Sequence, residues 1–186
     1  RSACDCARMA CNMVKRRYDK VCAVYDARLY EHLRLQSYVT DKVDEAIGKN
    51  YVKVFYQPIV RVETGKICGY EALARWDYPV MGFLPPSRFI LTLENFRMTH
   101  KVDCHVIHKV CEDLHGLIAS GEPAVPVSVN LSRLDFDLCD IFTEVEQYLT
   151  EYEVPRNLID IEITESAMNE DSKGLVSTVQ KFRDAG

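Results

Sequence analysis

The sequence lacks three features that would each have suggested a function. No window approaches about eighteen uncharged apolar residues, which excludes a membrane-spanning helix within it. Its first residues show no signal-peptide pattern of charge, apolar core and cleavage site. It has 23 Lys and Arg against 28 Asp and Glu, a net charge of −5. This balance argues against binding to a DNA or RNA polymer, because phosphate contacts need a positive field.

The eight cysteines include no Cys-x-x-Cys pair, the spacing typical of zinc and redox sites. Most lie in segments of apolar periodicity, where cysteine behaves as a small buried hydrophobe. We therefore predict reduced thiols and a cytoplasmic location rather than a disulfide framework. The positions are Cys4, Cys6, Cys11, Cys22, Cys68, Cys104, Cys111 and Cys139.

Four residues of metal-binding type lie along one predicted helix, namely Cys104, His108, Cys111 and His115. A helix rises about 1.5 Å per residue, so the outer two would be roughly 16 Å apart. One zinc ion with bonds of about 2 Å cannot bridge that separation. We interpret these residues as ordinary packing residues.

The distribution of charge predicts a boundary near residue 50. Residues 1–50 hold ten Lys/Arg and seven Asp/Glu, a net +3, and the remainder holds thirteen and twenty-one, a net −8. Before the boundary we predict a helix over 5–17, a short strand over 21–25, and a long helix capped by Asp26 and ended by Gly48. The first residue is Arg1 rather than Met, so we expect a longer parent protein, which an upstream sensor or membrane anchor would fit.

Beyond the boundary, strands alternate with helices, which indicates an α/β fold with a parallel sheet. A complete (β/α)₈ barrel needs about 250 residues. Here 186 − 50 leaves 136 residues, so we expect half a barrel with four strands. The predicted strands are 52–62 and 67–76 as a hairpin, 125–131 and 158–164. The predicted helices are 86–96, 99–119, 136–152 with Ser132 as its cap, and 172–184 with Gly186 after its end.

Three of these strands carry polar side chains on one face near their C-terminal ends, because side chains alternate along a strand. Two carboxylates and an amide oxygen suit Mg²⁺ or Mn²⁺ better than zinc. Such a cation can activate water and hold a phosphate, and an arginine can bind a phosphate oxygen. The alternative is structural: Glu71 and Arg75 form a buried ion pair, and Asn130 caps a loop. The alternating sets are Glu71, Leu73 and Arg75; Ser128, Asn130 and Ser132; and Asp160, Glu162 and Thr164.

Four short strings then occur in order. They are Tyr56-Gln57-Pro58-Ile59-Val60, Glu71-Ala72-Leu73-Ala74-Arg75-Trp76, Asn130-Leu131-Ser132 and Glu162-Ile163-Thr164-Glu165-Ser166. With them, residues 51–186 closely resemble the EAL family of cyclic di-GMP phosphodiesterases, named for the Glu-Ala-Leu tripeptide. The resemblance implies a TIM-like barrel with an antiparallel first strand, of which this sequence holds the first four strands.

The resemblance also implies roles for individual residues. Glu71, Asn130 and Glu162 correspond to metal ligands for Mg²⁺ or Mn²⁺, and Glu165 to an anchor of the catalytic loop. The residues implied to line the site of cyclic di-GMP are Gln57, Leu73 and Arg75. The family's Asp-Asp-Phe-Gly motif and catalytic lysine would follow Gly186, so we expect the 186-residue sequence alone to be inactive.

The implied activity of the parent protein is hydrolysis of cyclic di-GMP to the linear dinucleotide pGpG. The alternative is a degenerate EAL domain that serves as a cyclic di-GMP receptor or dimerisation module. Residues 1–28 resemble the tail of a GGDEF (diguanylate cyclase-like) domain, which often precedes EAL domains, and an ordinary packing helix is the alternative there. We assign 29–50 to a linker helix and 51–186 to half of an EAL domain. Because four strands cannot close a barrel, we expect a homodimer that covers the open sheet edge.

Overall fold

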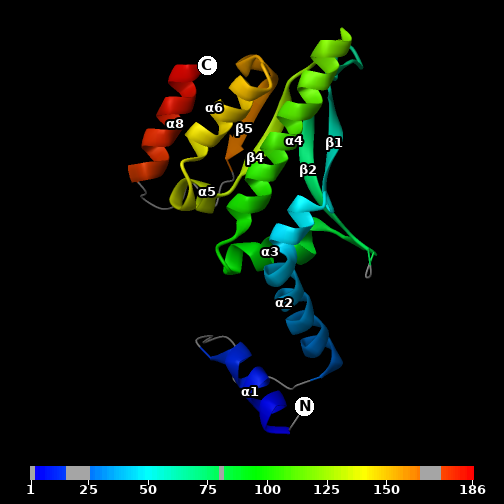
Figure 1. Cartoon of the computed structure of the whole chain (residues 1–186), viewed down its shortest axis with the longest axis vertical. Coiled ribbons are helices and arrows are strands. Elements are labelled where there is room, and N and C mark those ends of the chain that lie inside the picture. The colour runs from blue at the N-terminus through cyan, green and yellow to red at the C-terminus, as the bar shows by residue number, and fades with distance from the viewer. Residues whose placement is uncertain (1–2, 16–25, 80–81, 164–172) are drawn as a thin grey trace. The chain divides into compact units, whose positions relative to one another are not determined.

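The computed structural model describes residues 3–15, 26–79, 82–163 and 173–186. The chain divides into two compact units, Arg1–Asp41 and Lys42–Gly186. The first unit contains helix α1 (Ala3–Val14) and most of helix α2 (Ala27–Gly48), which continues into the second unit (Figure 1). The strand predicted over 21–25 lies outside the described residues.

Helix α2 begins and ends where the sequence predicts. The backbone N–H of Leu29 donates to Asp26 Oδ1 at 2.8 Å, which confirms Asp26 as the N-cap. The predicted end at Gly48 is confirmed, although the left-handed residue that follows the helix is Asn50. Asn50 adopts the left-handed conformation, with φ 54°, and the N–H of Tyr51 reaches back to the carbonyl of Ala46 at 2.7 Å. Asparagine tolerates this conformation better than most residues, so Asn50 can turn the chain away just after the helix.

The second unit is built on one mixed sheet with strand order β1-β2-β4-β5 (Figure 1). β1 and β2 form the predicted antiparallel hairpin, and β2, β4 and β5 are parallel neighbours. A short strand missed by the sequence analysis, β3, pairs with the end of β2, so the described part has five strands rather than four. The strands are β1 (Val52–Val60), β2 (Ile67–Tyr78), β3 (Gly82–Leu84), β4 (Val127–Leu131) and β5 (Ile159–Ile163).

The helices of this unit largely follow the predicted order. They are α3 (Pro86–Asn95), α4 (Thr99–Ser120), α5 (Arg133–Leu138), α6 (Ile141–Glu151), the 3₁₀ turn η1 (Arg156–Leu158) and α8 (Lys173–Ala185). Gly121, with φ 76°, ends α4 as its left-handed C-cap. None of the described helices combines the length and hydrophobicity required to cross a membrane.

The single helix predicted over 136–152 is wrong, because two caps divide it. Ser132 and Asp135 form a reciprocal capping box that starts α5. Cys139 is then extended, and the Asp140 side chain accepts from the N–H of Thr143 to start α6. The sequence pattern predicts one amphipathic helix because the apolar spacing continues across the break.

The core lies between the sheet and the helices that cover one of its faces, here called the outer face (Figure 1). Trp76 is completely buried and meets the ring of Phe89 edge-on, with centroids 5.6 Å apart. The predicted core stripe of α4 is confirmed except at its last residue, Leu117, which is 42% exposed. The buried members of this stripe are Val102, Val106, Val110 and Leu114.

Candidate functional site

Strand register places the predicted site residues on the opposite side of the sheet, here called the inner face. Gln57 pairs with Glu71 across the hairpin, Glu71 pairs with Ser128, and Ser128 pairs with Asp160. Paired residues point to the same side of a sheet, so these four side chains form one row. Two residues further along β4 and β5, Asn130 and Glu162 form the start of a second row, in register with each other.

Glu71 and Asn130 meet directly. The Asn130 Nδ2 group donates to Glu71 Oε1 at 2.9 Å, although 59 residues separate them in the sequence. Glu162 is the register partner of Asn130 and is exposed on the same face. The three residues predicted as metal ligands are therefore brought to neighbouring strands on one face.

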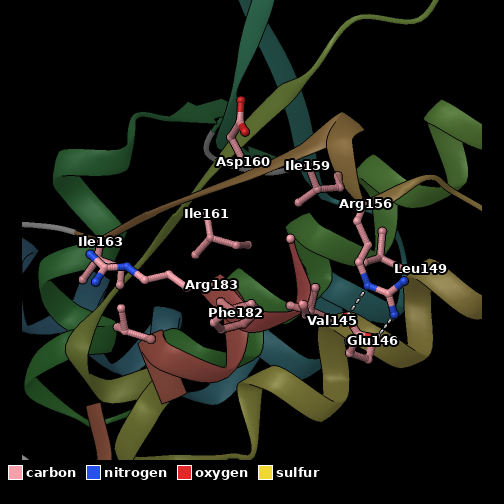
Figure 2. A pocket seen from close by; sticks show the side chains of 13 residues that line it. Val145, Glu146, Leu149, Arg156, Ile159, Asp160, Ile161, Ile163, Phe182 and Arg183 are labelled. Carbon is pink, nitrogen blue, oxygen red and sulfur yellow. Dashed lines mark hydrogen bonds and ion pairs between the residues drawn. The ribbon is translucent and has the colours of Figure 1, made fainter. Parts of the chain in front are cut away.

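Strand β5 shows the two faces most clearly (Figure 2). Its isoleucines Ile159, Ile161 and Ile163 line an outer pocket of about 460 Å³ with side chains of α6 and α8, including Phe182. Asp160 projects from the other side of the strand, away from that apolar cluster (Figure 2). The alternation predicted for 158–164 is confirmed over the described strand.

The structural alternative for Glu71 and Arg75 does not hold. Glu71 accepts from Asn130, and Arg75 Nη1 donates to the backbone carbonyl of Ala74 at 2.9 Å. In the described part of the chain Arg75 forms no ion pair, so most donors of its half-buried guanidinium have no carboxylate partner there. Asn130 caps no helix either, because Ser132 performs that role.

The other substrate residues implied by the resemblance also lie on the inner face. Gln57 is exposed at the register position opposite Glu71, and Leu73 is half-buried two residues beyond Glu71 on β2. Glu165, predicted to anchor a loop, lies outside the described residues.

Sequence reasoning gave no role to Ser128, which lies between Glu71 and Asp160 on the inner face. Ser128 is only 4% exposed, and within the described residues its hydroxyl has no hydrogen-bond partner. A buried hydroxyl without a partner is unfavourable and commonly marks a place where a ligand or water binds. The sequence predicts Ser128 on the polar face of its strand, and the structure adds that its hydroxyl is buried there.

The chain turns sharply after Asn130, and a buried carboxylate holds that turn. Asp135 is fully buried, and its Oδ2 accepts from the N–H of Ser132 at 2.6 Å. Burial raises the pKa of Asp103 on α4 well above its usual value, and the neighbouring carboxyl of Asp135 raises it further. Burial also raises the pKa of Asp135, although its hydrogen bonds oppose that shift. Asp103 therefore carries the proton of this pair, and Asp135 keeps the charge that Ser132 stabilises.

The Cys and His residues along α4 have other partners. His108 Nε2 lies 2.8 Å from the Tyr152 hydroxyl, and His115 Nδ1 lies 2.7 Å from the Tyr152 carbonyl oxygen. Burial raises the pKa of Cys111 to about 12, and that of Cys104 is also raised, so both are poor sources of thiolate. Over the described ranges, no three His, Cys, Asp or Glu side chains are grouped to hold a metal ion. The cluster on the inner face differs because its third oxygen comes from the amide of Asn130.

Parallel strands that carry carboxylate and amide side chains on one face and are covered by helices on the other define an α/β protein. The EAL domain model matches residues 40–186, which include the whole sheet. The chain therefore belongs to the EAL domain family.

Individual relatives agree with this assignment. The chain is 35% identical over 142 residues to the oxygen sensor protein DosP of Escherichia coli K12, covering 76% of this chain and 18% of DosP. It is 27% identical over 146 residues to the cyclic di-GMP phosphodiesterase NbdA of Pseudomonas aeruginosa, covering 78% and 19%. The solved structure of PaMucR phosphodiesterase in a c-di-GMP complex matches the fold with a TM-score of 0.72 at 23% identity, covering 80% of this chain and 60% of that one. The chain thus spans less than a fifth of the length of these curated relatives.

Proposed function

We propose that the protein containing this chain hydrolyses cyclic di-GMP to the linear dinucleotide pGpG at the inner face of its EAL domain. The observation that carries this proposal is the contact of Glu71 with Asn130, with Glu162 in register beside them. The family of the chain and its similarity to NbdA, a cyclic di-GMP phosphodiesterase, support the choice of substrate.

The inner-face cluster fits a divalent cation of the Mg²⁺ or Mn²⁺ type. Glu71, Asn130 and Glu162 offer hard oxygen donors, which these ions prefer. The unpartnered hydroxyl of Ser128 adds a buried polar atom on the same face. A cation bound by Glu71, Asn130 and Glu162 would supply Lewis-acid polarisation of the substrate phosphate.

The protein's own residues then position the dinucleotide. The guanidinium of Arg75, which has no carboxylate partner among the described residues, would bind a phosphate oxygen through its paired donors. The Gln57 amide would hydrogen-bond the substrate beside Glu71, and Leu73 would contact it through its apolar side chain. Glu165 would anchor the loop that follows β5.

A matched pair of variants tests this function in the full-length natural protein. Glu71→Gln removes one charge while keeping the shape of the side chain, and we expect at least about a hundredfold loss of pGpG formation with Mn²⁺. Glu63→Gln, at an exposed position in the hairpin turn, is the control and should retain wild-type turnover. Chromatography of the products measures both rates.

Three outcomes separate the alternatives. Loss of turnover in Glu71→Gln alone supports the phosphodiesterase. Tight binding of cyclic di-GMP by the wild type without turnover would favour the receptor instead. Absence of both binding and turnover in the wild type would overturn the proposal.

We also propose a domain organisation for the parent protein. We assign 1–28 to a GGDEF tail, 29–50 to a linker helix and 51–186 to the EAL domain, in a cytoplasmic protein with a GGDEF or sensor domain upstream. In the described residues no strand pairs with β5 on the side away from β4, and such an edge favours association. We therefore propose that the 186-residue chain forms a homodimer, and light scattering showing a stable monomer at micromolar concentration would contradict it.

A further inference from the structure

Two phenylalanine rings lie half-exposed on the inner face beside the polar cluster. Phe55 on β1 is 50% exposed and Phe83 on β3 is 53% exposed. Their rings form an edge-to-face pair with centroids 6.1 Å apart, which fixes both in one arrangement. We call Phe55 and Phe83 the aromatic pair.

The strand register places the aromatic pair on the same side of the sheet as the proposed phosphate site. Phe55 is the partner of Leu73, and Phe83 is the partner of Asp77. Leu73 and Asp77 follow Glu71 by two and six residues on β2, and positions separated by even numbers share a face. One pleat repeat along a strand is roughly 6.6 Å, so the row of Phe55 and Leu73 lies about that far from the row of Glu71.

The surroundings of the aromatic pair are polar. Lys53 and Asp77 form an ion pair of 3.8 Å on this face, and both side chains are about half exposed. Arg75 lies between Leu73 and Asp77 on β2 and forms no ion pair among the residues described. A small apolar platform with charges around it and a free phosphate-binding group beside it fits a nucleotide better than the broad apolar face of a protein helix.

We propose that the aromatic pair is the platform for one purine base of the cyclic dinucleotide: the base stacks on the ring of Phe55, and Phe83, whose ring lies at 72° to that of Phe55, supports it edge-on. Stacking of a base on an aromatic side chain is worth about 1–3 kcal/mol and does not depend on the base's hydrogen-bonding pattern. The platform therefore supplies affinity for a purine and fixes its plane, while Arg75 would bind a phosphate of the same dinucleotide and Glu71 would hold the cation. This inference rests on the proposed function, because it assigns the base of the same substrate.

Binding to the full-length natural protein tests the platform. The probe is cyclic di-GMP, followed by calorimetry, and an analogue with 2-aminopurine in place of one guanine, followed by fluorescence. Phe55→Ala should weaken binding about 5- to 150-fold, the equivalent of the stacking energy, and Phe83→Ala should weaken it less, because that ring contacts edge-on. Phe55→Leu, which keeps apolar volume without the ring, should also bind weakly. Phe55→Trp, which keeps an aromatic ring, should bind with an affinity close to that of the wild type.

The control is Phe96→Ala, because Phe96 is also 53% exposed but lies at the end of α3 rather than on the sheet. It should bind like the wild type. Stacking quenches 2-aminopurine, so the wild type should quench the analogue and Phe55→Ala should not. A purely structural role for the ring would not produce this difference.

The outcomes distinguish this inference from the function on which it rests. Wild-type affinity and quenching in Phe55→Ala and Phe83→Ala would overturn the platform while leaving the phosphodiesterase intact. Failure of the wild type to bind cyclic di-GMP would overturn both. Equal weakening by Phe96→Ala would also overturn the platform, since it would show a general effect of removing exposed rings.

Discussion

The two faces of the sheet differ in the burial and polarity of their side chains. On the outer face Val52, Trp76, Val129 and Leu131 are completely buried under helices. On the inner face the same strands expose carboxylates, amides and a pair of aromatic rings. Alternate residues of a single strand therefore form the core on one face and the proposed ligand site on the other.

This difference separates the residues that stabilise the fold from the residues of the proposed site. Burial of apolar side chains on the outer face stabilises the fold at about 25 cal/mol per Å². The inner face gains little of this energy, because Phe55, Phe83 and Glu162 stay open to solvent. Substitutions on the outer face should therefore act on stability, and substitutions on the inner face on binding and catalysis.

The largest expected effect is on the outer face, at Trp76. Trp76→Ala should lower the free energy of unfolding by about 3–5 kcal/mol, because it leaves a cavity against Phe89. Asn130→Ala on the inner face should lower it by less than about 1 kcal/mol, since it removes one exposed hydrogen bond. Urea unfolding followed by circular dichroism measures both, and a comparable loss from the two would erase the distinction between the faces.

Much of this division could be predicted from the sequence. The alternation of isoleucine with Asp160 and Glu162 predicted both faces of β5, and the hairpin and parallel order followed from the pattern of strands and helices. The meeting of Glu71 and Asn130 followed from the resemblance to the EAL family and from the polar faces predicted for their strands, although Glu71 lies in the first half of β2 rather than near its end.

What the sequence left undetermined depends on local backbone geometry and on register. The three-residue strand β3 is too short for a periodic signal, so Phe83 had no predicted place beside Phe55. The break at Asp140 was hidden because apolar spacing continues through it. The isolation of the Ser128 hydroxyl depends on neighbours from two other strands, which no local pattern encodes.

The second expected effect concerns the capping box of Ser132, which directly follows the end of β4. Ser132→Ala removes the side-chain acceptor of the capping box and should destabilise the fold by about 1 kcal/mol. Because Ser132 follows Asn130 closely, the same variant should also reduce turnover. Ser120→Ala is the matched control, since that hydroxyl donates to Leu117 on an exposed helix end and its loss should change stability by less than about 0.5 kcal/mol. Equal effects of the two variants on the urea midpoint would show that the capping box contributes nothing.

The smallest expected effect concerns the carboxyl of Asp103 on α4, one of the helices that cover the outer face. A charge there is unfavourable because the group is shielded from solvent. Burial and the carboxyl of Asp135 raise the pKa of Asp103, with a further contribution from Glu94 on α3. The pKa of an aspartate in an unfolded chain is about 3.9. Between that value and the raised pKa the folded state binds more protons than the unfolded state, so the free energy of unfolding falls as pH rises through this interval.

Asp103→Asn keeps the shape of the side chain and removes its titration, so this part of the pH dependence should disappear. Relative to the wild type, the variant should gain stability as pH rises above about 4, the ordinary pKa of an aspartate. Asp184→Asn, on the exposed end of α8, should follow the wild-type profile at every pH. Thermal unfolding at a series of pH values gives the comparison. If Asp103→Asn and the wild type lose stability in parallel above pH 4, the buried carboxyl pair does not limit the helix layer. A carboxylate under the helices would then cost the fold no more free energy than an exposed carboxylate on the inner face.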